Sequence, residues 1–195
     1  MSASETRSVY ATVGATNRSK FEREQHDYYA TDPIAIELLL DKVRFSRDVW
    51  ECACGEGHLS KVLRNRGYNV LSTDLIDRGY GEGGIDFLQD ARKFNGDIIT
   101  NPPYSLASEF VEHAHELIDD GHKIAMFLKL QFLEGVRRKE LFGRYPPKTV
   151  YVSSGRLRCA KNGDFEKYKD ANAVAYAWYV WQKGFTGDSV LKWIN

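Results

Sequence analysis

The segment Asn101-Pro102-Pro103-Tyr104 carries side chains whose types and spacing could do chemistry. It follows a short apolar run, residues 96–100, that is typical of a buried strand. Since neither proline has an N–H for a sheet ladder, the strand must end at Asn101. An asparagine is therefore held by a stiff turn at the carboxyl end of a strand, which is the edge where ligands bind in open α/β sheets.

Such a turn suits group transfer to the exocyclic amino group of a base. That nitrogen is a poor nucleophile, because its lone pair is delocalised into the ring. The amide oxygen of Asn101 and the backbone carbonyl of Pro102 could accept the two amino hydrogens and stabilise the charge that develops during attack. The ring of Tyr104 could stack on the base. An ordinary loop is the alternative interpretation of the same four residues.

A second candidate site lies upstream, where a strand expected over residues 48–52 turns into a helix. Gly55 and Gly57 would let the backbone approach a ligand closely. The full phosphate-binding glycine fingerprint is absent, because the residue three after Gly57 is Ser60. Glu51 would also repel a pyrophosphate, and it favours a ligand with an ammonium and a sulfonium group over NAD. The alternative interpretation is a strand-turn-helix that binds no ligand. Such a turn requires the two glycines but gives no reason for Glu51.

Two further acids could serve the same ligand. Asp74 follows an expected strand over residues 69–73 and lies about 20 residues beyond the glycine turn, where ribose hydroxyls are held in this class of site. A solvated aspartate in a loop is the alternative. Asp86 could accept from an adenine amino group, and Phe87 could stack on the adenine ring.

Two tyrosines and a threonine, Tyr28, Tyr29 and Thr31, precede a helix start. Asp32 followed by Pro33 is a capping acid with proline at the first helical position. The cap accounts for Asp32 and Pro33 but not for the residues before them, which are either core anchors or a ligand wall.

The elements that must position these residues alternate between strands and helices. A basic helix precedes Pro146-Pro147, residues 153–172 are expected to form a long loop, and residues 184–195 a tail whose Trp193 and Ile194 dock on the core. One helix has an apolar face of Ile34, Ile36, Leu38, Leu39, Leu40 and Val43. The expected strands cover residues 48–52, 69–73, 96–100, 123–130, 149–152 and 173–182, and further helices follow residues 58 and 106.

Composition is that of an ordinary folded domain. The chain has 195 residues, of which 43% are apolar and 28% charged. We expect a flexible segment over residues 1–25 and one domain over residues 26–195. No apolar run approaches the roughly 20 residues needed to span a bilayer, and the polar start predicts no secretory signal. Three cysteines without repeated metal spacing predict packing rather than metal binding, and a cytoplasmic protein with reduced thiols.

A net charge of zero hides an asymmetry. Residues from 131 onward carry 12 lysines and arginines against six acids, which leaves +6 there and −6 elsewhere. A basic third suits a polyanionic partner, although solvated helix faces give similar counts. The candidate nucleic-acid contacts are Arg137, Arg138, Lys139, Arg156, Arg158 and Lys161, followed by Lys167 and Lys169, with Phe165 and Tyr168 as possible stacking or wedge residues.

With these segments in order, the sequence resembles the S-adenosylmethionine-dependent amino-methyltransferases of DNA. It looks like the small phage and prophage N6-adenine enzymes that carry a Tyr-Tyr-Ala-Thr-Asp-Pro segment near the start. Asn-Pro-Pro-Tyr with an upstream Glu-x3-Gly-x-Gly is a specific combination, whereas either half alone is not. The matching segments are Tyr28 to Pro33, Glu51 to Gly57, Asp74, Asp86-Phe87 and Asn101 to Tyr104.

The resemblance implies a Rossmann-like class I methyltransferase fold of the α/β class, with a seven-stranded, mostly parallel sheet, an antiparallel last strand and helices on both faces. It implies a catalytic segment of Asn101, Pro102, Pro103 and Tyr104, and a duplex base that is flipped out to reach it. The implied S-adenosyl-L-methionine site consists of Tyr28, Tyr29, Thr31, Glu51, Ala53, Gly55, Gly57, Asp74, Leu75, Asp86, Phe87 and Asn101.

The expected partner is DNA or RNA. We expect no association with a membrane. DNA enzymes of this family usually carry a substantial target-recognition domain, whereas here only elements within residues 131–172 are available for that role. A short target site, a homodimer in place of a monomer, or a separate recognition partner would each resolve the difference.

Other functions are compatible with parts of the pattern. The same chemistry could act on cytosine N4, on adenine in RNA or on a glutamine amide, although asparagine at position 101 favours adenine. A catalytically silent nucleic-acid-binding protein could keep the fold, but such a pocket would be free to lose Asn101, Gly55, Gly57 and Asp74. An NAD-dependent oxidoreductase is disfavoured by Glu51 and by the Asn-Pro-Pro-Tyr segment.

Overall fold

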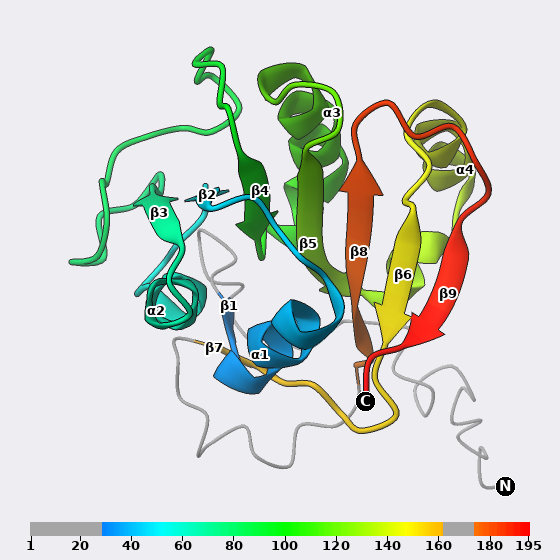
Figure 1. Cartoon of the computed structure of the whole chain (residues 1–195), viewed down its shortest axis with the longest axis horizontal. Coiled ribbons are helices and arrows are strands. Elements are labelled where there is room, and N and C mark those ends of the chain that lie inside the picture. Colours follow the sequence, from blue (N-terminus) through cyan, green and yellow to red (C-terminus); the bar gives the residue numbers. More distant parts are fainter. Residues whose placement is uncertain (1–28, 162–173) are drawn as a thin grey trace, which may run out of the picture.

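The computed structural model describes residues 29–161 and 174–195, in which seven strands form one central sheet. Their order is β3-β2-β4-β5-β8-β6-β9, from one side of Figure 1 to the other. Of the seven, β8 alone runs antiparallel to its neighbours β5 and β6. The expected seven-stranded, mostly parallel sheet is therefore confirmed. Its strands are β2 (Asp48–Glu51), β3 (Asn69–Ser72), β4 (Asp97–Thr100), β5 (Lys123–Lys129), β6 (Thr149–Val152), β8 (Tyr176–Gln182) and β9 (Val190–Trp193).

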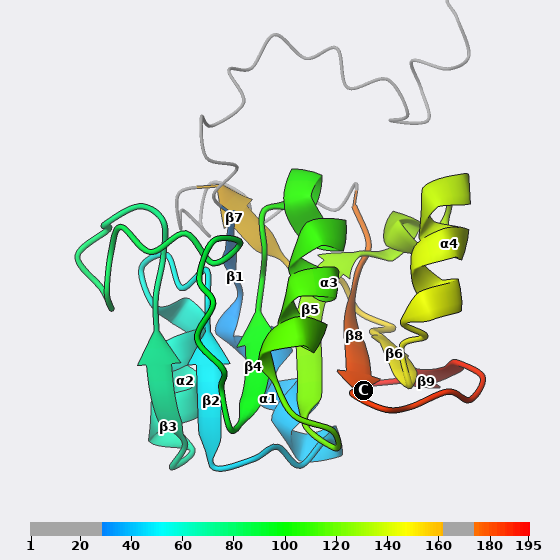
Figure 2. The ribbon, with the colours of Figure 1, turned by 90° about the horizontal axis from the view of Figure 1, so that it is seen from above.

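Helices cover both faces of this sheet, as expected (Figure 2). Because neighbouring residues of a strand point to opposite faces, Val49 and Ile99 pack on one side while Trp50 and Ile98 pack on the other. The first side is covered by α1 and α2 and the second by α3 and α4. The helices are α1 (Pro33–Lys42), α2 (His58–Asn65), α3 (Ala107–Leu117) and α4 (Val136–Arg144), with short 3₁₀ helices η2 (Tyr104–Leu106) and η3 (Leu130–Leu133).

Helix α1 begins as the sequence predicts. The Asp32 carboxylate accepts a hydrogen bond from the N–H of Ile34 at 3.2 Å, and Pro33 occupies the first helical position. Ile36 and Leu39 are fully buried. The expectation that Ile34 belongs to the buried face is wrong: its side chain is 50% exposed, since Ala35, Ile36 and Leu39 define the buried direction of the helix.

Two segments far apart in the sequence form a second, two-stranded sheet. Strand β1 (Tyr29–Thr31) pairs antiparallel with β7 (Cys159–Lys161), with Thr31 opposite Cys159 (Figures 1 and 2). The prediction of a loop over all of residues 153–172 is therefore wrong for β7. A three-residue strand is too short to show an alternating pattern, and its partner lies far away along the chain.

The last strand was also missed. Residues 184–195 were expected to form a tail, but β9 pairs parallel with β6 at the edge of the sheet. The reversed strand predicted over residues 173–182 is β8, and β9 follows it. Ile194 is buried, as expected, whereas Trp193 is 61% exposed and does not dock on the core. All four residues of β9 are exposed, so the strand has no hydrophobic alternation by which to be recognised.

Several expectations fall outside the described residues. These are the segment 1–25, Tyr28, and the part of the recognition region at residues 162–172 with Phe165, Lys167, Tyr168 and Lys169. None of the helices in the part of the chain that the structure describes is long and apolar enough to cross a membrane.

Candidate active site

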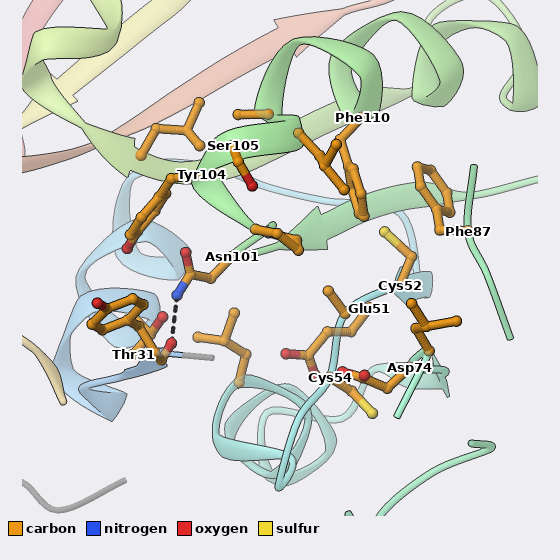
Figure 3. A pocket seen from close by; sticks show the side chains of 18 of the residues that line it. Thr31, Glu51, Cys52, Cys54, Asp74, Phe87, Asn101, Tyr104, Ser105 and Phe110 are labelled. Atoms are coloured by element: carbon orange, nitrogen blue, oxygen red, sulfur yellow. Dashed lines mark hydrogen bonds between the residues drawn. The ribbon is translucent and has the colours of Figure 1, made fainter. Parts of the chain in front are cut away.

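A cavity of about 920 Å³ opens at the carboxyl ends of β2, β4 and β5 (Figure 3). One part, the β2–β3 end, is lined by residues that follow β2 and β3, including Glu51, Cys54 and Asp74. The other part, the β4 end, is lined by Asn101 and Tyr104 together with residues of β1 and residues that follow β5. A volume near the upper limit of about 300–1,000 Å³ for small-molecule sites leaves room for more than one ligand group.

Asn101 has a fixed orientation at the β4 end. Its Nδ2 donates a hydrogen bond to the backbone carbonyl of Tyr29 at 2.7 Å, the dashed contact in Figure 3. Since a carbonyl can only accept, this bond identifies which side-chain atom is the nitrogen. The oxygen Oδ1 is buried and has no hydrogen-bond partner among the described residues. An unsatisfied buried acceptor costs about 1–3 kcal/mol, so Oδ1 is ready to accept from a ligand.

The ring of Tyr104 lies between aromatic and basic neighbours. It stacks on Tyr29 with ring centroids 5.9 Å apart and planes inclined by 27°, and Lys129 Nζ lies 4.9 Å from its centroid. Its hydroxyl lies 3.2 Å from Cys159 Sγ. Burial raises the pKa of Tyr104 well above its ordinary value, so the phenol is neutral. A base that stacked on this ring would compete with Tyr29 or Lys129 for one of its faces.

The two prolines differ in their exposure to the cavity. Pro103 lines it and precedes η2, whose first residue is Tyr104. Pro102 is buried and is not part of the lining. The turn thus brings Asn101, Pro103 and Tyr104 to the cavity wall.

Glu51 is a buried acid at the β2–β3 end. It is 2% exposed and accepts a hydrogen bond from the hydroxyl of Ser60, which in turn lies 2.6 Å from the hydroxyl of Ser72. Burial raises the pKa of Glu51 to about 8. The side chain is therefore mostly protonated at neutral pH, and a cation bound beside it would restore the carboxylate.

Asp74 holds the turn between β2 and α2. Its Oδ2 accepts from the N–H of Gly55 at 2.8 Å, and its Oδ1 accepts from the N–H of Ile76 at 2.9 Å. A carboxylate has about four lone-pair sites, so two remain for ligand hydroxyls. Asp74 and Leu75, which is 53% exposed, both line the cavity.

The two glycines of the turn do not line the cavity, whereas Ala53 and Cys54 do. Gly57 is in the left-handed region with φ of 79° at the cap of α2. A Cβ atom there would lie 2.4 Å from the ring of Tyr80. Gly57 therefore allows a close contact with a protein ring.

Phe87 and Asp86 come from the loop after β3. Phe87 lines the cavity but is buried against Trp50 and Phe110, with ring centroids 5.2 and 4.8 Å apart. Asp86 is exposed at the rim, and its Oδ1 accepts from the N–H of Leu88 at 3.0 Å. Tyr29 and Thr31 reach the lining from β1.

The predicted nucleic-acid contacts separate into three groups. Arg138 lines the cavity, donates to the hydroxyl of Ser108 and lies 4.2 Å from the ring centroid of Phe132. Arg137, Lys139 and Arg156 are exposed and do not line it. In the third group, at β7, Arg158 forms an ion pair with Asp32 at 3.1 Å, and Lys161 is the last residue of the strand.

Cys159 and Lys129 were not predicted as site residues. Lys129 ends β5, so the rule that ligands bind at the carboxyl ends of parallel strands would have identified it. No signal identified Cys159, because its position depends on the pairing of β1 with β7. Cys52 and Cys54 are buried free thiols. Within residues 29–161 and 174–195, no group of three or more His, Cys, Asp or Glu side chains could hold a metal ion.

Comparison with known proteins gives structural matches only. No protein-family model matches the chain, and no curated protein sequence matches it. A type I restriction-modification system methyltransferase subunit from Streptococcus thermophilus has a similar structure, with a TM-score of 0.60 and 13% identity. The match extends over 87% of this chain and 48% of that subunit.

Two further structures match comparably. A protein from Listeria monocytogenes described as a class I S-adenosylmethionine-dependent methyltransferase has a TM-score of 0.59 and 11% identity, over 82% of this chain and 62% of that one. A protein from Lactococcus lactis described as a hemolysin has a TM-score of 0.61 and 10% identity, over 82% and 91% of the two chains. At these identities the comparison shows the fold alone, and this chain has the class I methyltransferase fold.

Proposed function

We propose that this chain is an S-adenosylmethionine-dependent methyltransferase that modifies the exocyclic N6 amino group of adenine in DNA, on a base flipped out of the duplex. The observation that carries the proposal is Asn101. Its nitrogen is held by the Tyr29 carbonyl, and its oxygen is buried at the cavity wall without a partner among the described residues. An acceptor so oriented fits one hydrogen of an amino group.

The β2–β3 end fits the cofactor. S-adenosylmethionine would supply an electrophilic methyl carbon and brings two cationic groups, an ammonium and a sulfonium. Glu51, whose pKa burial raises to about 8, is a buried acid that a cation would stabilise. Asp74 keeps acceptor capacity for ribose hydroxyls. The other proposed cofactor contacts are Tyr28, Tyr29, Thr31, Ala53, Gly55, Gly57, Leu75, Asp86, Phe87 and Asn101.

The β4 end fits the base. Asn101 Oδ1 accepts one amino hydrogen, and the backbone carbonyl of Pro102 is the second acceptor that the proposal requires. Transfer of the methyl group would break its bond to the sulfonium sulfur, leave a neutral thioether and place positive charge on the amino nitrogen, and both acceptors would stabilise that charge. The nitrogen then loses one of its hydrogens as a proton to solvent. Tyr104 stacks on the base, in exchange for a contact with Tyr29 or Lys129.

Support for a nucleic-acid substrate comes from Arg138, which lines the same cavity as Asn101 and Tyr104. Arg137, Lys139, Arg156 and Lys161 are further candidate phosphate contacts. The matched Streptococcus thermophilus protein is a methyltransferase subunit of a restriction-modification system, and this chain spans about half of it. We propose that target recognition involves a short target site, a homodimer or a separate partner protein.

The test is transfer of isotope-labelled methyl from S-adenosylmethionine to DNA and RNA of mixed sequence, followed by nucleoside mass spectrometry. We expect label in N6-methyladenine of DNA, lowered by about 10²- to 10³-fold in Asn101→Ala. Asn95→Ala is the matched control, because Asn95 is exposed, precedes β4 and contacts the half-buried His122 at the other end of the strand. Label in N4-methylcytosine or in RNA would keep the chemistry and correct the proposed substrate. Cofactor binding without transfer to either polymer would favour a catalytically silent binding protein.

A further inference from the structure

The two-stranded sheet β1–β7 stands directly beside the β4 end of the cavity. It is extended beyond its paired residues by two contacts between Asp32 and Arg158: the N–H of Asp32 donates to the Arg158 carbonyl, and the side chains form an ion pair at 3.1 Å. Because β1 supplies the Tyr29 carbonyl that holds Asn101, the pairing of β1 with β7 also determines where Asn101 points.

One sulfur atom of this sheet contacts both Asn101 and Tyr104. Cys159 Sγ lies 3.2 Å from the Tyr104 hydroxyl and 3.9 Å from Asn101 Nδ2. The amide nitrogen therefore has two acceptors on the same side, the Tyr29 carbonyl and the sulfur. Both contacts keep the nitrogen turned away from the position where a base amino group would need an acceptor.

The Cys159 side chain is suited to this contact and not to nucleophilic chemistry. Burial raises the pKa of the Cys159 thiol to about 12. The thiol is thus neutral at physiological pH, and reactive cysteines need a lowered pKa instead. A neutral thiol has one hydrogen to donate and a sulfur to accept with, so it can bridge the amide and the phenol at the same time.

We propose that Cys159 is a positioning residue, and that the β1–β7 pair is a clamp that keeps Asn101 Oδ1 and the Tyr104 ring aimed at the substrate base. The proposal rests on the proposed function, and it assigns to Cys159 a role in the rate of transfer and none in cofactor affinity. Without the clamp the amide can rotate and present its NH2 group, a donor, to the amino group that needs an acceptor. A misplacement of about 1 Å can lower a rate by about 100-fold.

The test compares Cys159→Ala and Cys159→Ser with Leu157→Val as matched control. Leu157 is buried two residues before Cys159, packs in the apolar cluster around α1 and does not line the cavity. We expect Cys159→Ala to lower kcat by about ten-fold or more, with unchanged affinity for S-adenosylmethionine by calorimetry. Cys159→Ser should recover most of the rate, and Leu157→Val should keep kcat while lowering Tm.

A second measurement does not depend on transfer. The side-chain amide signal of Asn101 in a ¹⁵N-correlated NMR spectrum is identified by its loss in Asn101→Ala, and it should shift and broaden in Cys159→Ala but stay in place in Leu157→Val. An unchanged signal and an unchanged kcat in Cys159→Ala would overturn the clamp, as would an equal loss of kcat in Leu157→Val. If wild-type protein methylates neither polymer, the proposed function fails, and the NMR result still decides the clamp.

Discussion

The two ends of the cavity are stabilised in different ways. At the β2–β3 end the polar groups are satisfied by near neighbours in the chain: Asp74 accepts from Gly55, and Glu51 accepts from Ser60. At the β4 end Asn101 is held from β1, 72 residues away, and its oxygen has no partner among the described residues. The β2–β3 end is therefore a turn whose polar groups bond to one another. The β4 end is assembled from distant segments around Asn101 Oδ1, which is an unpaired acceptor among the described residues.

Among variants that leave Asn101 in place, the largest effect on kcat/KM should come from removing the stacking ring at the β4 end. Tyr104→Ala is expected to lower kcat/KM for DNA by about 10- to 100-fold or more, because stacking of one base on an aromatic ring contributes about 1–3 kcal/mol. Tyr104→Phe keeps the ring and loses only the contacts of its hydroxyl with Cys159 and Tyr176, so its loss should be smaller. Steady-state kinetics would check both variants, and equal losses would contradict stacking as the role of Tyr104.

At the β2–β3 end, Glu51→Gln should weaken binding of S-adenosylmethionine by about 10- to 100-fold, since a hydrogen bond to a charged group contributes about 1.5–3 kcal/mol. Calorimetry would measure the affinity, with Glu56→Gln as control, because Glu56 is exposed in the same turn. Wild-type affinity should also rise as the pH is raised towards 8, when Glu51 ionises more easily. Affinity unchanged by Glu51→Gln would remove Glu51 from the cofactor site.

The same variant should change how stability depends on pH. The pKa of Glu51 is raised from 4.5 in a free side chain to about 8 in the folded protein. The folded protein therefore holds this proton more tightly than the unfolded chain, and its stability falls as the pH rises from 4.5 to 8. Glu51→Gln cannot lose a proton, so its Tm should exceed that of wild type increasingly towards pH 8. Parallel Tm curves for the two proteins would contradict the raised pKa.

The β2–β3 end of the cavity could be predicted from the sequence more completely than the β4 end. The β2–β3 end consists of consecutive elements, so the strand-turn-helix pattern and the acid at position 74 were sufficient to place Glu51 and Asp74 at one cavity. Asn101 was found because two prolines end its strand. The contacts that hold Asn101 were not found, since β1 and β7 are three residues each and meet only in the folded chain.

The same limit applies to two other features. The strand β9 is exposed along its length and shows no pattern of burial. Gly57 was expected to make room for a ligand, but its missing side chain makes room for Tyr80, whose position depends on a glycine-rich loop with no periodicity. Sequence patterns predict structure formed by residues close together in the chain. They do not predict contacts between residues that meet only in the folded protein.

A smaller effect on stability is expected at Gly57. Gly57→Ala combines a left-handed backbone with overlap against Tyr80, whereas Gly67→Ala, with φ of 88° and nothing within 4 Å, has only the backbone strain. That strain costs about 1–2 kcal/mol. Thermal unfolding should therefore show a larger drop in Tm for Gly57→Ala, at about 2–4 °C for each kcal/mol in a protein of this size. Equal drops would show that Tyr80 moves without cost.

The smallest effects should separate the arginines of α4. Arg138→Ala is expected to lower kcat/KM for DNA by about ten-fold, the loss of one hydrogen bond to a charged group. Arg137→Ala should change kcat/KM less, because its side chain is exposed and does not line the cavity. If both arginines contact phosphates, each variant should reduce by about one unit the slope of log affinity for DNA against log salt concentration. A larger loss for Arg137→Ala would place the DNA outside this cavity.

The most direct measurement is the single-turnover rate of methyl transfer to DNA by wild type and Asn101→Ala, at saturating DNA and S-adenosylmethionine. If Asn101 Oδ1 accepts from the target amino group, the rate should fall by about 10²- to 10³-fold, as for the loss of one preorganised hydrogen bond in a transition state. An unchanged rate in Asn101→Ala would contradict the account.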